Sequence, residues 1–181
     1  MKLLDKKIFI GMSVAILGGL ILFTSGNKPS EINGTISTDV KEKIYFKEAV
    51  GKKAPDFELE SINGGTVKLS DYLGKNVVLF FNEGAMCYPA CWDQIAQLGN
   101  DLRFDTESIA AFSIVVDTKN QWLDIVSKSP NLAKSKILFD TSRSVSKAYD
   151  VLYLDSPMHP GALPGHTYFI IDKEGIIRFT L

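Results

Sequence analysis

The sequence has few cysteines and no excess of charge of either sign. Twenty basic and 21 acidic residues give a net charge of −1 at pH 7, which excludes the basic face that nucleic-acid binding normally requires. Internal repeats and low-complexity tracts are also lacking. With 181 residues, 45% of them hydrophobic, the chain can bury the core of one ordinary domain and has room for an appendage.

The N-terminal residues form the one long hydrophobic run. Lys2, Lys6 and Lys7 precede an uncharged stretch from Ile8 to Thr24. Its length suits either a signal peptide or a membrane anchor, but Thr24-Ser25-Gly26 is a poor cleavage site. The pattern therefore favours an uncleaved anchor over residues 1–25.

The charge pattern around this anchor predicts its orientation. Lysines before the hydrophobic run keep that side in the cytoplasm, so the rest of the chain is expected outside. Residues 26–48 are polar and are expected to form a linker, and residues 49–181 to form the folded domain. The expected location is the cell membrane, with a single pass and an extracytoplasmic domain.

Strand-like and helix-like segments alternate after Gly51, which predicts an α/β three-layer domain. The apolar run NVVLFF at 76–81 is typical of a strand covered on both faces. The other expected strands are 56–60, 66–69, 109–116, 137–139, 167–172 and 176–180, and helices are expected to begin near Pro89, after Thr118 and after Asp140.

Both cysteines lie in GAMCYPACW, the loop that joins the 76–81 strand to the next helix. A disulfide between Cys87 and Cys91 closes a very short loop and adds little stability, which argues against a purely structural role for the disulfide. The positive end of a helix favours a thiolate, so Cys87 is the expected nucleophile and Cys91, about one turn later, the resolving partner. Buried, inert thiols are the alternative interpretation.

Several sequence blocks resemble the redoxin superfamily, which includes AhpC/TSA peroxiredoxins and TlpA-like proteins. They are GKKAPDFELESINGGTVKLSDYLGKNVVLFFNEGAMC from Gly51, DTSRSVSKAYDVL from Asp140 and GHTYFIIDKEGIIR up to Arg178. The resemblance implies a thioredoxin-like α/β/α fold with a central mixed sheet. It also implies a helix after the last strand, so a truncated C-terminus is one interpretation.

The resemblance implies a thiol-dependent oxidoreductase that reduces peroxides or exchanges disulfides, needs no cofactor and receives electrons from a thiol protein. The P-x-x-x-T-x-x-C pattern of peroxiredoxins, however, would place its proline and threonine at Phe80 and Gly84. The W-C-x-x-C form of TlpA-like reductases is one residue shorter than the spacing here. When the expected strand at 167–172 is aligned with the matching strand of the reductases, His166 stands at the position of their cis-proline. The resemblance therefore makes His166 the third residue of the expected site.

A copper chaperone of the Sco type is a further alternative, because that family also combines a membrane anchor, C-x-x-x-C and a distant histidine. Two thiolates and an imidazole suit copper. His159 and His166 are the only histidines. Glu83, in the loop with the cysteines, is expected to be solvated, and a proton relay to or from a thiol is the alternative. Trp92 is expected to line the site and Trp122 to lie in the core.

Overall fold

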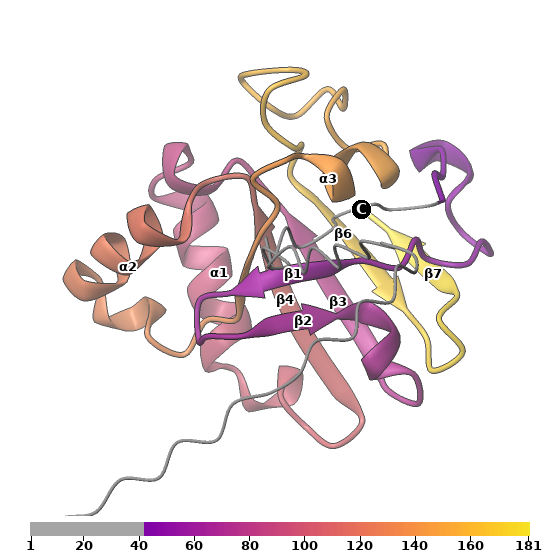
Figure 1. The fold of residues 1–181 in the computed structure, drawn as a ribbon, viewed down its shortest axis with the longest axis horizontal. Coiled ribbons are helices and arrows are strands. Elements are labelled where there is room, and N and C mark those ends of the chain that lie inside the picture. Colours follow the sequence, from indigo (N-terminus) through magenta and orange to yellow (C-terminus); the bar gives the residue numbers. More distant parts are fainter. Residues whose placement is uncertain (1–41) are drawn as a thin grey trace, which may run out of the picture. The chain divides into compact units, whose positions relative to one another are not determined.

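A seven-stranded mixed sheet lies at the centre of the computed structural model, which describes residues 42–181 (Figure 1). The strand order is β2-β1-β5-β4-β3-β6-β7; β5, β4 and β3 run parallel, and every other pairing is antiparallel. The strands are β1 (Glu58–Ser61), β2 (Thr66–Lys68), β3 (Asn76–Phe81), β4 (Ile109–Val115), β5 (Ile137–Phe139), β6 (Thr167–Ile171) and β7 (Ile177–Thr180).

Three α-helices accompany these strands: α1 (Ala90–Asn100), α2 (Lys119–Lys128) and α3 (Ser144–Ala148). In Figure 1, α1 and α2 lie together and α3 lies apart from them. Short 3-10 helices occupy Phe46–Glu48, Leu69–Tyr72, Gly84–Met86, Leu102–Phe104 and Pro130–Leu132. The predicted α/β fold with a central mixed sheet is confirmed.

The two faces of the sheet bury two separate cores, which explains the continuous hydrophobic run of β3. Alternate side chains of the strand point to opposite faces. One core lies near α3 and contains three side chains of β3 together with Val145 and Tyr149; the β3 side chains are Val77, Leu79 and Phe81. The other core lies on the opposite face, where Phe80 packs with Ile95 of α1 and Trp122 of α2. This central position fixes the carboxyl end of β3, from which the loop with both cysteines starts.

The described end of the expected linker, residues 42–48, packs onto the sheet. Ile44 is buried and its N–H donates to the carbonyl of Ala148 at 2.9 Å, while the Phe46 ring contacts Phe169 edge-on. Residues of the expected linker therefore contact the folded domain: Ile44 is buried and Phe46 is partly buried, whereas Tyr45 is 65% exposed. The expected anchor at 1–25 and the rest of the linker lie outside the described residues.

No helix within residues 42–181 is long and apolar enough to cross a membrane.

The start of α3 is held by a buried carboxylate, as the sequence predicts for Asp140. One carboxylate oxygen accepts from the N–H of Val145 at 3.2 Å, and the other accepts from the N–H and the hydroxyl of Ser146, both at 2.7 Å. Burial raises the pKa of Asp140, although these hydrogen bonds act in the opposite direction. Tyr149 directly follows α3, and its hydroxyl donates to the carbonyl of Pro55 at 2.9 Å.

Candidate functional site

The loop between β3 and α1 is fixed by two side chains and by a glycine. The side-chain oxygen of Asn82 accepts from the N–H of Gly84 at 2.9 Å, and Asp117 accepts from the N–H of Ala85 at 3.0 Å. Gly84 has φ +65°, and a Cβ there would lie 1.8 Å from the Asp117 carboxylate. Only glycine therefore lets the loop approach Asp117 this closely.

Asp117 was not singled out by the sequence analysis. Its Oδ2 also accepts from the indole N–H of Trp122 at 3.0 Å, so a single oxygen connects the active loop to α2. The residue follows β4, the parallel neighbour of β3, and the carboxyl ends of parallel strands meet at one edge of a sheet. That position is the sequence signal that could have revealed it.

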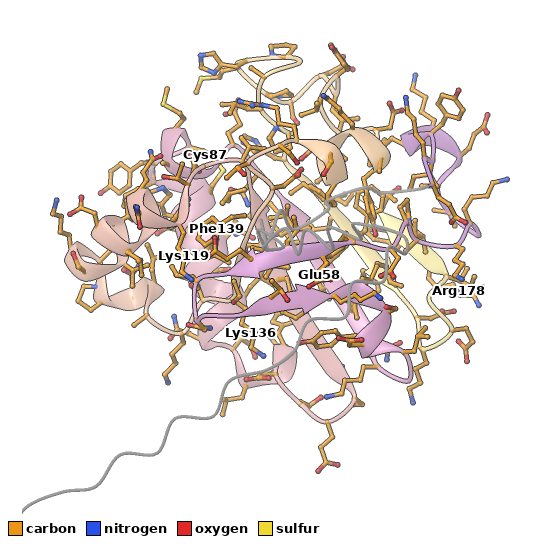
Figure 2. All side chains as sticks on the ribbon, in the orientation of Figure 1. Glu58, Cys87, Lys119, Lys136, Phe139 and Arg178 are labelled. Carbon is orange, nitrogen blue, oxygen red and sulfur yellow. A yellow bond between two sulfur atoms is a disulfide. The ribbon has the colours of Figure 1, made fainter. Side chains whose placement is uncertain are left out.

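The two cysteines form a disulfide where the loop passes into α1. Cys87 directly follows the 3-10 helix Gly84–Met86, and Cys91 is the second residue of α1. Their Cα atoms are 5.3 Å apart, inside the usual range for a bridge. Cys91 is 3% exposed and Cys87 is half-buried, so Cys87 is the sulfur that a reactant reaches. In Figure 2, Cys87 lies at the end of the domain where the loop between α3 and β6 projects.

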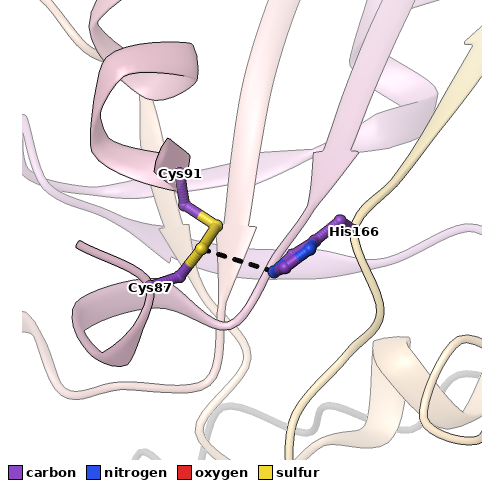
Figure 3. Close-up of side chains that lie close together, drawn as sticks. All are labelled: Cys87, Cys91 and His166. Carbon is purple, nitrogen blue, oxygen red and sulfur yellow. Dashed lines mark hydrogen bonds between the residues drawn. A yellow bond between two sulfur atoms is a disulfide. The ribbon is translucent and has the colours of Figure 1, made fainter. Parts of the chain in front are cut away.

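His166 lies beside the disulfide, in agreement with the proximity expected from the sequence. Its Nε2 is 3.4 Å from the Sγ of Cys87 (Figure 3). The backbone N–H of His166 donates to the hydroxyl of Ser156 at 2.9 Å, which fixes the chain just before β6. The side chain is 36% exposed, so the imidazole is accessible to solvent as well as to the sulfur.

Glu83 is fully buried, so the expectation of a solvated carboxylate was wrong. The loop between α3 and β6 covers it: the N–H of Met158 donates to its Oε1 at 2.7 Å. Its Oε2 is 3.5 Å from the Nε2 of His166 but has no hydrogen-bond partner among the described residues. The Nδ1 of His159 is 4.0 Å from Oε1. A buried carboxylate thus lies next to the imidazole that contacts Cys87.

A hollow of about 210 Å³ opens onto the disulfide and His166. Phe80, Ala90 and Leu181 give it apolar walls, with Gln94 and Tyr168. The Tyr168 hydroxyl donates to the side-chain oxygen of Gln94 at 2.7 Å, and burial raises the pKa of Tyr168, which keeps this donor protonated.

Trp122 lies in the core, as the sequence predicts, whereas Trp92 is not among the residues that line the hollow at the disulfide. Trp92 packs edge-on against the exposed ring of Tyr88 at 4.9 Å between ring centres, and against Trp122 at 5.9 Å. Trp122 is fully buried in the core beside α2.

The sulfurs of Cys87 and Cys91 and a ring nitrogen of His166 all lie within 4.8 Å of one another. With the disulfide reduced, this set offers two thiolates and an imidazole, the donors that suit Cu(I) and Zn²⁺.

Comparison with known proteins identifies the family. Residues 50–180 match the AhpC/TSA family. The chain belongs to this family.

Among curated AhpC/TSA relatives, the chain is 34% identical to peroxiredoxin Bcp of Bacillus subtilis over 130 residues, which are 70% of this chain and 80% of that protein. It is also 34% identical to the chloroplast 2-Cys peroxiredoxin BAS1 of Spinacia oleracea over 138 residues, 71% of this chain and 50% of that protein. The chain thus spans about half the length of the spinach relative.

Solved structures give the same fold. A reduced 2-Cys peroxiredoxin from Plasmodium vivax superposes with a TM-score of 0.60 at 30% identity, covering 74% of this chain and 71% of that chain. AhpC of Enterococcus faecalis superposes with a TM-score of 0.63 at 17% identity, covering 74% and 80%, and supports the fold alone.

Proposed function

We propose that the protein is a thiol-dependent oxidoreductase in which Cys87 and Cys91 cycle between dithiol and disulfide, with a peroxide as oxidant. The observation that carries this proposal is the bridge between an accessible and a buried sulfur at the start of α1, with His166 Nε2 3.4 Å from the accessible one. Membership of a family whose matched relatives are named peroxiredoxins supports peroxide as the oxidant.

The cycle has three balanced steps. The Cys87 thiolate attacks one peroxide oxygen, the O–O bond breaks, and the leaving alkoxide takes a proton, which gives an alcohol and Cys87 sulfenic acid. The Cys91 thiol then displaces water from the sulfenic acid and forms the disulfide. Two thiols of a donor protein reduce the disulfide, with Cys87 as the attacked sulfur because it is the more exposed.

One feature of the loop favours disulfides as alternative oxidants. Phe80 and Gly84 stand where peroxiredoxins of the family pattern carry proline and threonine, and Phe80 is buried in the core while Gly84 has no hydroxyl. Without that hydroxyl the site has one fewer donor for a peroxide oxygen. A thiol–disulfide exchange reaction needs only an accessible sulfur and a resolving one.

The test measures the reaction of the full-length protein, in detergent micelles, with a peroxide and with a disulfide. We expect the wild type to consume hydrogen peroxide and an alkyl hydroperoxide with dithiothreitol, and Cys87→Ser to lose this activity. Cys91→Ser is the matched control, since it should still form one sulfenic acid per chain, detected with a dimedone probe and mass spectrometry. A wild-type rate no faster than that of Cys87→Ser rejects the peroxidase, and reduction of insulin disulfides by the same sample would identify exchange.

Copper binding is the second candidate, favoured by the mutual distance of at most 4.8 Å among the donor atoms of Cys87, Cys91 and His166. Reduced protein should then bind one Cu(I) per chain in competition with bathocuproine disulfonate. His166→Ala should weaken the binding, whereas His159→Ala is the control. Equal affinity of the two variants and the wild type contradicts this candidate.

We also propose that residues 1–25 anchor the domain outside the cytoplasm, on the basis of Lys2, Lys6 and Lys7 before the hydrophobic run. Fused after Leu181 in a bacterial host, alkaline phosphatase should be active in the membrane fraction. High phosphatase activity in the soluble periplasmic fraction would indicate a cleaved signal, and an inactive fusion would contradict the orientation.

A further inference from the structure

The carboxylate of Glu83 is buried with one oxygen unpaired, although it belongs to no step of the proposed cycle. Its side chain is 0% exposed, and Oε2 has no hydrogen-bond partner in the described part of the chain. Burying a carboxylate is strongly unfavourable unless charge or hydrogen bonds compensate it. The polar atom that faces Oε2 is the Nε2 of His166, at 3.5 Å.

We propose that Glu83 is a positioning residue that acts on Cys87 through His166, so that the three form a Cys–His–Glu triad. The inference rests on the proposed thiol chemistry and adds a residue to it. Nε2 of His166 lies 3.4 Å from the Cys87 sulfur (Figure 3). The same nitrogen lies 3.5 Å from Oε2 of Glu83, so a single ring nitrogen faces both groups.

This geometry suits a proton transfer within the reduced site. The S–H proton of Cys87 passes to Nε2 of His166, which leaves a thiolate and an imidazolium and changes no other bond. The imidazolium then lies between two negative groups, and the Glu83 carboxylate compensates its charge inside the protein. When the thiolate attacks, the same proton goes to the departing oxygen or sulfur, and His166 returns to its neutral form.

The loop between α3 and β6 holds both partners of the triad in place. Oε1 of Glu83 accepts from the N–H of Met158, and the Ser156 hydroxyl accepts from the N–H of His166. Glu83→Gln keeps the Oε1 acceptor and the shape of the side chain while it removes the charge. The variant therefore separates the effect on His166 from the anchoring of the loop.

Two other effects compete with the triad. A carboxylate close to a thiolate repels it directly, and removal of Glu83 would then make Cys87 more reactive instead of less. The second effect is that of His159, which also faces Glu83: its Nδ1 lies 4.0 Å from Oε1, although its side chain is 49% exposed. His159→Asn serves as the control for a general effect of nearby histidines.

The experiment is a double-mutant cycle on the alkylation rate of Cys87 in the reduced full-length protein, with iodoacetamide at pH 7 and Cys91 replaced by serine throughout. Glu83→Gln should slow alkylation about tenfold, the loss expected when one pKa unit of stabilisation is removed. In a His166→Asn background the same change should alter the rate less than twofold. Equal slowing in both backgrounds, an unchanged rate or a faster one overturns the triad.

A measurement on the unsubstituted histidines covers the case in which Glu83→Gln fails to fold. With only two histidines in the chain, ¹⁵N-histidine labelling gives a simple spectrum, and His159→Asn assigns it. Both ring nitrogens of His166 should be protonated in the reduced protein at pH 7, and one should lose its proton after Cys87 is alkylated. A neutral ring in the reduced protein contradicts the proposal. Neither measurement uses peroxide, so a failure of the peroxidase assay is distinguishable from a failure of the triad.

Discussion

Gly84→Ala tests how the active loop is built. At φ +65° a side chain costs roughly 1–2 kcal/mol. The added Cβ would lie 1.8 Å from Oδ2 of Asp117, so the carboxylate has to move and lose the N–H groups of Ala85 and Trp122. Hydrogen bonds to a charged group contribute about 1.5–3 kcal/mol each, so we expect a total loss of about 4–8 kcal/mol.

Urea unfolding followed by tryptophan fluorescence measures this loss. Gly64→Ala is the matched control, because Gly64 has φ +92° and an added Cβ there meets nothing within 4 Å. The control should lose only the backbone cost, roughly 1–2 kcal/mol. If the two variants unfold within about 1 kcal/mol of each other, the contact between Asp117 and the loop does not contribute as argued.

Two further predictions concern the packing around α3. Since burial raises the pKa of Asp140, the folded protein keeps this proton when the unfolded chain, with a pKa near 3.8, has lost it. The contribution of protonated Asp140 to folding stability is therefore complete below pH 3.8 and falls as the pH rises through the pKa of the folded state. Urea midpoints measured against pH should show this decrease in the wild type but not in Asp140→Asn. Tyr149→Phe should cost about 1–3 kcal/mol, because the buried carbonyl of Pro55 loses its donor; an unchanged urea midpoint would show that this hydrogen bond contributes nothing.

Local sequence patterns predicted most of the elements because they depend on neighbouring residues. The run NVVLFF coincides with β3, and Thr118 accepts from the N–H of Gln121 at the start of α2 as a helix cap should. The strand order depends instead on pairings between distant segments, such as β1 with β5, which no local pattern contains. For that part the resemblance to a known family was needed.

The parts of the site that depend on the spacing of residues in one motif could be predicted from the sequence. The parts that depend on which distant loop covers them could not. The positions of Cys87 and Cys91 at the start of a helix followed from one short motif. The burial of Glu83 did not, because the N–H that binds its carboxylate belongs to Met158, 75 residues later. The sequence of the loop from 150 to 166 gives no periodic signal that would show which surface it covers.

The distance between His166 and Cys87 is set by the register of β3 and β6. Phe81 pairs with Thr167, so the chain that leaves β3 toward the cysteines starts beside the residue that follows His166. The pairing is held on both faces of the sheet: Phe80 stacks on Tyr168 at 4.5 Å between ring centres, and Phe81 packs edge-on against Phe169 at 5.6 Å.

A shift of this register by one residue would turn each aromatic side chain of β6 toward the opposite core. Phe169 would then leave its cluster with Phe81 for the side of α1, and His166 would move along β3 by about one residue, or roughly 3.4 Å. A displacement of that size would break the present contact of 3.4 Å between Nε2 of His166 and Sγ of Cys87. The aromatic pairs on both faces of the sheet, together with the hydrogen bond from His166 to Ser156, therefore keep the imidazole within reach of the sulfur.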